Sequence, residues 1–75
     1  MKLTDFEYIA MEALIINAGK TVSRNHFMYR FYDNPCNKDI KIVSVIICRL
    51  RKKLGRHING HQITTIKNKG YSFLR

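Results

Sequence analysis

Acidic residues, cysteines and long apolar runs are all scarce in this sequence, and each shortage argues against a class of protein. The 5 Asp and Glu residues are scattered along the chain, so no carboxylate pair suited to acid–base catalysis is expected, and we predict that the protein is not an enzyme. The longest nearly unbroken apolar run, Ile42 to Cys48, is far shorter than the roughly 20 residues that span a bilayer.

Metal-ligating residues are sparse as well. Cys36 and Cys48 are the only cysteines, and they lie too far apart to form the close pair that is typical of zinc sites. His57 and His61 have a four-residue spacing that zinc ligands can show, but loop residues surround them. We therefore expect no metal and no other cofactor. Without a secretory pattern, the two cysteines indicate reduced thiols in a cytoplasmic protein.

Positive charge is abundant by contrast. The 75 residues include 14 Lys and Arg, which gives a formal net charge of +9, and 45% of the residues are hydrophobic. A chain of this length and composition forms one folded domain, residues 1–75, with a modest core. Its charge favours a polyanionic partner, either a nucleic acid or an anionic membrane surface.

The first expected element is a helix over residues 5–18. Thr4 and Glu7 are spaced as a capping box at its start, and Gly19 stands where a C-terminal cap belongs. Apolar residues recur at helical spacing, with Leu14 beside them, and predict the buried stripe Tyr8, Met11, Ile15 and Ala18.

A second helix is expected over residues 24–32. Thr21 and Val22 can form a very short strand before it, and Ser23 is a favourable N-cap. The N-terminal amides, helped by Arg24, are suited to holding a phosphate. Turn residues 33–37 end the helix, and its expected inner face consists of Phe27, Met28 and Phe31.

The third expected helix begins at Asp39 or Lys41 and ends at Leu54, before Gly55. One apolar stripe is predicted from Val43, Ile47, Leu50 and Leu54. The opposite side carries Lys41, Val45, Cys48, Arg49 and Lys52, while Arg51 and Lys53 flank the stripe. No acidic residue occurs from Lys41 to the end of the helix, so an external anion is the natural partner.

Two β-rich runs, residues 63–66 and 71–74, follow a polar loop. Asn68 and Gly70 tolerate the positive φ of a tight turn, so the runs predict a hairpin with Lys67 and Lys69 at its tip. The expected fold is mainly α with a small β wing. Three helices followed by a C-terminal β-hairpin form a winged helix-turn-helix.

Four sequence blocks, in order and with the expected gaps, resemble the DNA-binding domain of OmpR/PhoB-type response regulators. Residues 3–8 are similar to L-T-x-x-E-[FY], and residues 17–24 to N-x-G-x-x-[VL]-[ST]-R. Residues 43–54 are similar to V-D-V-x-I-x-R-L-R-x-K-[LI], and residues 65–73 to T-V-R-G-x-G-Y-x-F. Within the family, residues 41–43 and 47–54 most resemble the CtrA-like branch of alphaproteobacteria. The resemblance implies a bacterial or phage-encoded protein that is associated with the nucleoid.

The chain also departs from the family pattern. It carries no phosphoacceptor receiver domain, and the four-stranded sheet that usually precedes the first helix is absent, so we expect either a fragment or a stand-alone winged helix. Ser44 replaces the usual Asp, which removes a negative charge close to DNA. In the wing, Asn68 replaces Gly and Lys67 replaces Arg, and Lys cannot make the planar, bidentate contacts of Arg.

The resemblance implies roles for the basic residues in binding double-stranded DNA. We expect Arg49 to bond a guanine edge in the major groove and Val45 to touch a thymine methyl, with Cys48 on the same face. Lys41, Lys52 and Arg51 would hold phosphates. In the wing, Lys67 and Lys69 would lie in or over the minor groove, and Thr65 would reach a phosphate or a base.

Other modes of action stay open from the sequence. The same charge suits a nucleoid-type binder with little sequence preference. The loop 33–38 would be the working surface of a module that recruits or blocks RNA polymerase, and two copies could form a dimer on DNA. A single-strand binder is disfavoured, because its aromatic residues should be exposed. The aromatics expected to face the core are Tyr8, Phe27, Phe31, Tyr71 and Phe73.

Overall fold

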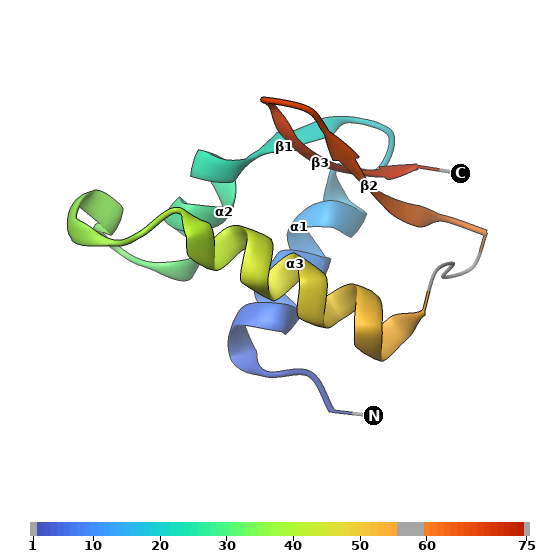
Figure 1. Cartoon of the computed structure of the whole chain (residues 1–75), viewed down its shortest axis with the longest axis horizontal. Helices are drawn as coiled ribbons and strands as arrows, with labels where there is room; N and C mark the ends of the chain where they lie inside the picture. Colours follow the sequence, from blue (N-terminus) through green and yellow to red (C-terminus); the bar gives the residue numbers. More distant parts are fainter. Residues whose placement is uncertain (1, 56–59, 75) are drawn as a thin grey trace.

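The computed structural model describes residues 2–55 and 60–74 as three helices packed against a small antiparallel sheet. Figure 1 shows α3 crossing in front of α1, with the sheet along one side of the helices. The predicted mainly α winged helix-turn-helix is confirmed. The helices are α1 (Asp5–Ile16), α2 (Arg24–Phe31) and α3 (Lys41–Leu54), with a 3-10 turn at Pro35–Asn37. The strands are β1 (Thr21–Ser23), β2 (Gln62–Ile66) and β3 (Gly70–Leu74).

Helix α1 begins with the predicted capping box but ends at Ile16, two residues earlier than expected. The side chain of Asn17 donates to the carbonyl of Ala13 at 2.8 Å, and Asn17 is the C-cap residue in place of Gly19. The N–H of Gly19 instead donates to the carbonyl of Phe73 at 3.1 Å. The helix therefore ends where its chain turns to join the sheet.

The predicted buried stripe of α1 was wrong at three of its four positions. Tyr8 and Ile15 are 61% and 55% exposed, and Ala18 is exposed as well, whereas Met11 is buried as predicted. The buried face is centred on Ala10, Ala13 and Leu14. The face that packs against α2 and α3 thus includes two small residues, and the apolar spacing alone did not identify it.

Helices α2 and α3 follow their predicted patterns closely. The Ser23 hydroxyl accepts the backbone N–H of His26 at 3.1 Å, and α2 ends one residue before the expected end. Asp39 Oδ1 accepts the backbone N–H of Lys41 at 2.9 Å, which helps to start α3. The buried residues of α3 are Val43, Ile46, Ile47 and Leu50, and Leu54 is half-buried.

The sheet has the strand order β1-β3-β2, so β3 is central and β2 is an edge strand. The short strand suspected at Thr21 pairs with β3, opposite Ser72. Asn68 has a φ of 61° in the turn, and the N–H of Lys69 donates to the carbonyl of Ile66 at 3.0 Å. We call β2, this turn and β3 the hairpin.

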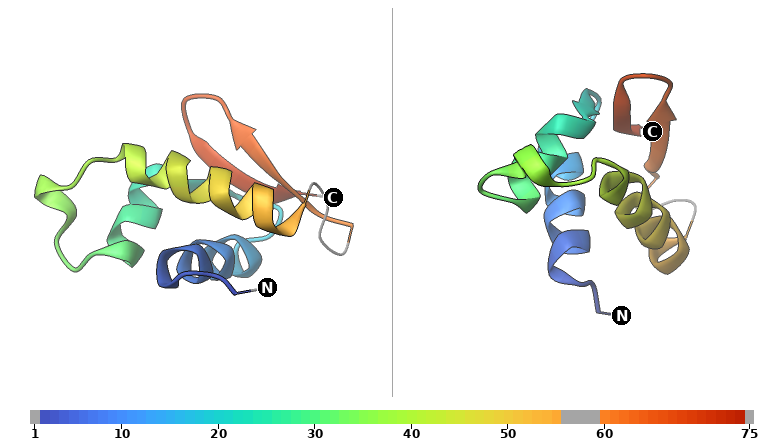
Figure 2. Two further views of the ribbon diagram at one scale, coloured as in Figure 1. Left: turned by 60° about the horizontal axis from the view of Figure 1, so that its bottom comes forward. Right: turned by 60° about the vertical axis from the view of Figure 1, so that its left-hand side comes forward.

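Gly70 is required where β3 passes β1. A Cβ atom at this position would lie 2.1 Å from the carbonyl oxygen of Val22, and the φ of Gly70 is 155°. No side chain fits there, so the glycine allows the two strands to pair. In all views the hairpin projects from the side of α3 opposite the N-terminal end of α1 (Figure 2).

Candidate nucleic-acid interface

The exposed side of α3 carries most of the residues predicted to contact DNA. Lys41, Val45, Cys48, Arg49 and Lys52 are all exposed. A shallow hollow of about 330 Å³ lies over this side. Its lining consists of Ser44, Val45, Cys48, Arg49 and Lys52. The structure thus brings the predicted base-contacting and phosphate-contacting residues of α3 onto one open surface.

The five cations of α3 divide into two groups. Arg51 and Lys53 are bound to other parts of the protein. Within residues 2–55 and 60–74, the side chains of Lys41, Arg49 and Lys52 form no hydrogen bond or ion pair. Their charges are therefore available to an external anion.

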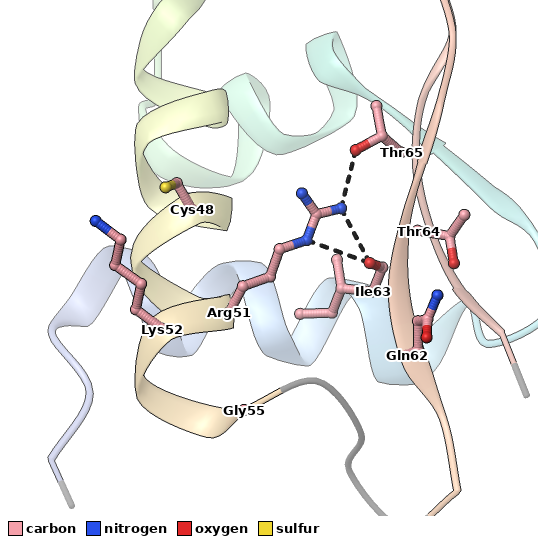
Figure 3. A pocket seen from close by; sticks show the side chains of 8 residues that line it. All are labelled: Cys48, Arg51, Lys52, Gly55, Gln62, Ile63, Thr64 and Thr65. Atoms are coloured by element: carbon pink, nitrogen blue, oxygen red, sulfur yellow. Dashed lines mark hydrogen bonds between the residues drawn. The ribbon is translucent and has the colours of Figure 1, made fainter.

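Arg51 extends from α3 across a groove to the edge strand β2 (Figure 3). Its Nε and Nη2 donate to the carbonyl oxygen of Ile63 at 3.2 and 2.9 Å. Nη2 also donates to Thr65 Oγ1 at 2.9 Å. The guanidinium carbon lies 5.8 Å from the ring centre of Tyr71. Arg51 was predicted only as a phosphate contact, and sequence reasoning missed these bonds because their partners lie 12 and 14 residues away.

Lys53 forms a partly buried ion pair with Glu7 of α1. Its ammonium lies 2.6 Å from Glu7 Oε1, which also accepts the backbone N–H of Thr4 at 2.8 Å. Glu7 is fully buried. The hydrogen bond from Lys53 is the largest cause of the lowered pKa of Glu7; the Thr4 backbone bond adds to it and desolvation opposes it. This pair joins α1 to α3, and the charge of Lys53 is balanced within the protein.

The remaining predicted contacts lie outside α3. Lys67 and Lys69 are exposed at the tip of the hairpin, and Thr65 is exposed on β2. Thr65 accepts the bond from Arg51, so its own hydroxyl proton can still be donated to another group. Arg24 is exposed in the first turn of α2.

The metal and aromatic predictions have different outcomes. His57 lies outside the described residues, so the His57–His61 spacing stays untested, while the ring of His61 stacks on Phe73 with centroids 4.8 Å apart. Residues 2–55 and 60–74 contain no group of three or more potential metal ligands.

The predicted inner aromatics Phe27, Phe31, Tyr71 and Phe73 are buried, whereas the same prediction for Tyr8 was wrong. In the described part of the chain, no helix is both long and apolar enough to cross a membrane.

A family model described as "Transcriptional regulatory protein, C terminal" matches residues 1–73. The chain belongs to this family. It is a family of transcription regulators and not an enzyme class. The chain is 40% identical over 73 residues to the transcriptional regulatory protein PhoP of Escherichia coli K12, and equally to the virulence transcriptional regulatory protein PhoP of Salmonella typhimurium LT2. Each alignment covers 97% of this chain and 33% of the relative, so the chain spans about a third of the length of these relatives.

Solved structures of the same fold include DNA-binding domains. The domain of Klebsiella pneumoniae RstA, solved in complex with the RstA box, superimposes with a TM-score of 0.80 at 28% identity, covering 97% of this chain and 73% of that one. The DNA-binding domain of Bacillus subtilis CssR has a TM-score of 0.80 at 22% identity and covers 96% of this chain and 77% of its own. The family and the winged-helix fold agree with the sequence-based expectation.

Proposed function

We propose that this protein is a transcription regulator that binds a specific sequence in double-stranded DNA. The observation that carries the proposal is the set of three exposed cations on α3, Lys41, Arg49 and Lys52, which form no ion pair with residues 2–55 and 60–74. An α-helix fits the major groove of B-DNA. Membership of the transcription-regulator family supports the proposal, as does the likeness to the RstA domain that was solved with its DNA box.

The exposed side chains of α3 divide into base-reading and phosphate-binding roles. Arg49 has a planar fork of donors that matches the O6 and N7 atoms of guanine, and Val45 offers an apolar surface to a thymine methyl. Lys41 and Lys52 neutralise phosphates, which positions the protein without reading sequence. Cys48 lies on the same exposed side of α3 and contacts the wall of the major groove.

The hairpin tip and α2 supply the remaining contacts. Lys67 and Lys69 lie over the minor groove or its phosphates, and the hydroxyl of Thr65 donates to a phosphate or a base. Arg24 and the N-terminal amides of α2 hold a further phosphate. The protein acts on the bacterial nucleoid, and no cofactor takes part.

Selection of bound sequences from a random DNA pool tests the proposal directly. We expect one motif to be enriched, and the purified motif to bind about 10³-fold or more tightly than a scrambled duplex of the same length and composition. Equal binding to both duplexes would contradict sequence-specific recognition. It would support instead a nucleoid-type binder that uses the same charge without base readout.

A second candidate function is contact with RNA polymerase through the loop 33–38. The observation that favours it is the exposed surface beside this loop, where Tyr29 and Ile40 are 70% and 42% exposed. Lys38 lies over the ring of Tyr32 at 5.1 Å, which gives the loop a defined shape. A pull-down with RNA polymerase tests it. Loss of the captured polymerase on changing Tyr29 to Ala, with DNA binding intact, would support this function.

A dimer on DNA is a further part of the proposal. Exposed apolar side chains on α1 favour it, since Tyr8, Ile15 and Ile16 are 61%, 55% and 64% exposed. They border a hollow of about 200 Å³, and no Lys or Arg occurs on α1. Sedimentation of the complex with a target duplex measures the stoichiometry. One protein per duplex at saturation would contradict the dimer.

A further inference from the structure

The hairpin meets α3 through a strand edge that the sheet leaves unpaired. Because β2 is an edge strand, its outward carbonyls have no partner strand. The carbonyl of Ile63 is one of these groups, and it accepts both Nε and Nη2 of Arg51. The carbonyl of Ile63, which would otherwise bond water, thus accepts hydrogen bonds from a side chain of α3.

The same guanidinium contacts the hairpin at three places. Besides Ile63, it donates to Thr65 two residues further along β2, and it lies near the ring of Tyr71 on β3. Two adjacent nitrogens of a rigid plane can reach successive groups of a strand, which the single ammonium of a lysine cannot do. These contacts define both the distance and the angle between α3 and β2.

Around Arg51, the helix and the hairpin are separated by a groove of about 530 Å³ (Figure 3). Ile63 is buried at its base. In the described part of the chain, every hydrogen bond that joins α3 to the hairpin comes from Arg51. Apolar contact holds the hairpin against the core, but it is non-directional, and the polar geometry across the groove depends on one side chain.

We propose that Arg51 is a positioning residue, which sets the hairpin tip relative to the exposed side of α3 so that both contact DNA together. The inference rests on the proposed function. Lys67 follows Thr65 by two residues, about 7 Å along an extended strand. A shift of β2 at Thr65 therefore also moves Lys67 and Lys69. It would withdraw the hairpin tip from the minor groove of the DNA while α3 stays bound in the major groove.

A direct phosphate contact by Arg51 predicts a different behaviour. Its three hydrogen bonds use Nε and Nη2 and leave Nη1 able to meet a phosphate. In that case the contributions of Arg51 and of the hairpin lysines to affinity would be independent. In the positioning role they are coupled, because the lysines contribute only when the hairpin is held in place.

A double-mutant cycle separates these two roles. Arg51→Met keeps the apolar stem and removes all donors; it is combined with the joint change Lys67→Ala and Lys69→Ala. We expect the loss of affinity caused by removing the two lysines to be about fivefold smaller in the Arg51→Met background than in the wild type. Arg51→Lys, which keeps the charge, should not restore the coupling.

Lys52→Met is the matched control. Lys52 lines the same groove and carries the same charge, but its side chain points away from β2 (Figure 3). Its removal should weaken binding and leave the cost of removing the hairpin lysines unchanged. Equal costs in the wild-type and Arg51→Met backgrounds, or rescue of the coupling by Arg51→Lys, would overturn the positioning role.

Hydrogen exchange of the β2 amides in the DNA-free protein gives an independent test. Arg51→Met should accelerate exchange in β2, whereas Lys52→Met should not. Thr65→Val removes the hydrogen bond from Arg51 to Thr65 and keeps the branched shape, so it should accelerate exchange less than Arg51→Met does. It replaces Arg51→Met as the test variant if Arg51→Met does not fold. Unchanged exchange in both Arg51→Met and Thr65→Val overturns the inference even if the wild type binds DNA. Failure of the wild type to bind any duplex contradicts the proposed function instead.

Discussion

The two sides of α3 carry the same charge and use it differently. On the exposed side, Lys41, Arg49 and Lys52 have no partner in the described part of the protein. On the sides that face the hairpin and α1, Arg51 bonds a strand edge and Lys53 bonds the buried Glu7. Arg49 and Arg51 are identical in chemistry and only two positions apart, yet a rotation of about 200° around the helix separates them.

This difference shows that a count of basic residues overestimates the charge that a polyanion meets. A helix with five cations and no acid presents three of them and uses two to hold its neighbours. In the functions proposed above, the exposed cations bind DNA, while Arg51 positions the hairpin relative to α3. Experiments can test this division because the two groups should respond differently to salt, to DNA sequence and to pH.

The largest expected effect is that of salt on DNA binding. Arg24, Lys41, Lys52, Lys67 and Lys69 give about five phosphate contacts, so log K against log salt should have a slope of roughly −4 to −5. Raising salt from about 50 to 200 mM should then weaken binding roughly 500-fold. Fluorescence anisotropy with a labelled duplex measures the slope. A slope near −6 would indicate that Arg51 and Lys53 also contact phosphates, and a slope near zero would exclude nucleic acid as the partner.

The next effect concerns Arg49. Arg49→Ala should cost about 1 to 3 kcal/mol on the target duplex and relax the preference at one base pair. Arg49→Lys should recover part of the affinity but little of the specificity, because one ammonium cannot copy two parallel bonds. Since Arg49 is exposed, the melting temperature should not change.

Binding of both Arg49 variants to target and scrambled duplexes gives the control. A larger loss on the target indicates base reading. If the loss is the same on both duplexes, Arg49 only touches phosphate, and the exposed side of α3 has no residue left with a bidentate fork.

A smaller effect is expected from each hairpin lysine. Lys67→Ala or Lys69→Ala should flatten the salt slope by about one unit and weaken all duplexes equally. Lys contacts phosphates as a point charge, so these residues position the protein without reading bases. Repeating the random-pool selection with each variant checks this. A changed motif would show that the hairpin takes part in base recognition.

The smallest effect on binding is expected from the bonded pair Lys53 and Glu7, whose role is in stability. Because the pKa of Glu7 is lowered in the folded protein, its ionised form stabilises the fold above the ordinary Glu pKa. That contribution is lost as pH falls through the lower, folded-state pKa. As the pH falls below the ordinary Glu pKa of about 4.5, the melting temperature of the wild type should therefore decrease more than that of Glu7→Gln.

At pH 7 the Glu7→Gln variant should melt at a lower temperature than the wild type, and its salt slope on DNA should be unaltered. Circular dichroism at several pH values provides the measurement. Parallel pH curves for the two proteins would mean that the Lys53–Glu7 pair does not contribute to the stability of the fold.

Local sequence patterns were sufficient for most of the fold. The Thr4–Glu7 capping box, the Ser23 cap and the turn at Asn68 each depend on residues within four positions of one another, and they were predicted correctly. The stripe of α3 follows from steps of three or four residues, and its prediction missed only Ile46. Periodicity failed on α1, where apolar residues surround much of the helix. There Tyr8 and Ile15 fitted the pattern as well as Ala10 and Leu14, and only the fit against α2 and α3 decided which were buried.

The sequence by itself also determined the excess of basic residues and the exposed side of α3, because a helix of known period with one apolar stripe leaves only one opposite face. It did not determine what Arg51 and Lys53 do. Their partners, Ile63 and Glu7, lie 12 and 46 residues away, and no local pattern encodes such a distance. The tertiary structure decided these roles, because a buried carboxylate and an unpaired strand edge need donors from wherever the fold brings them close.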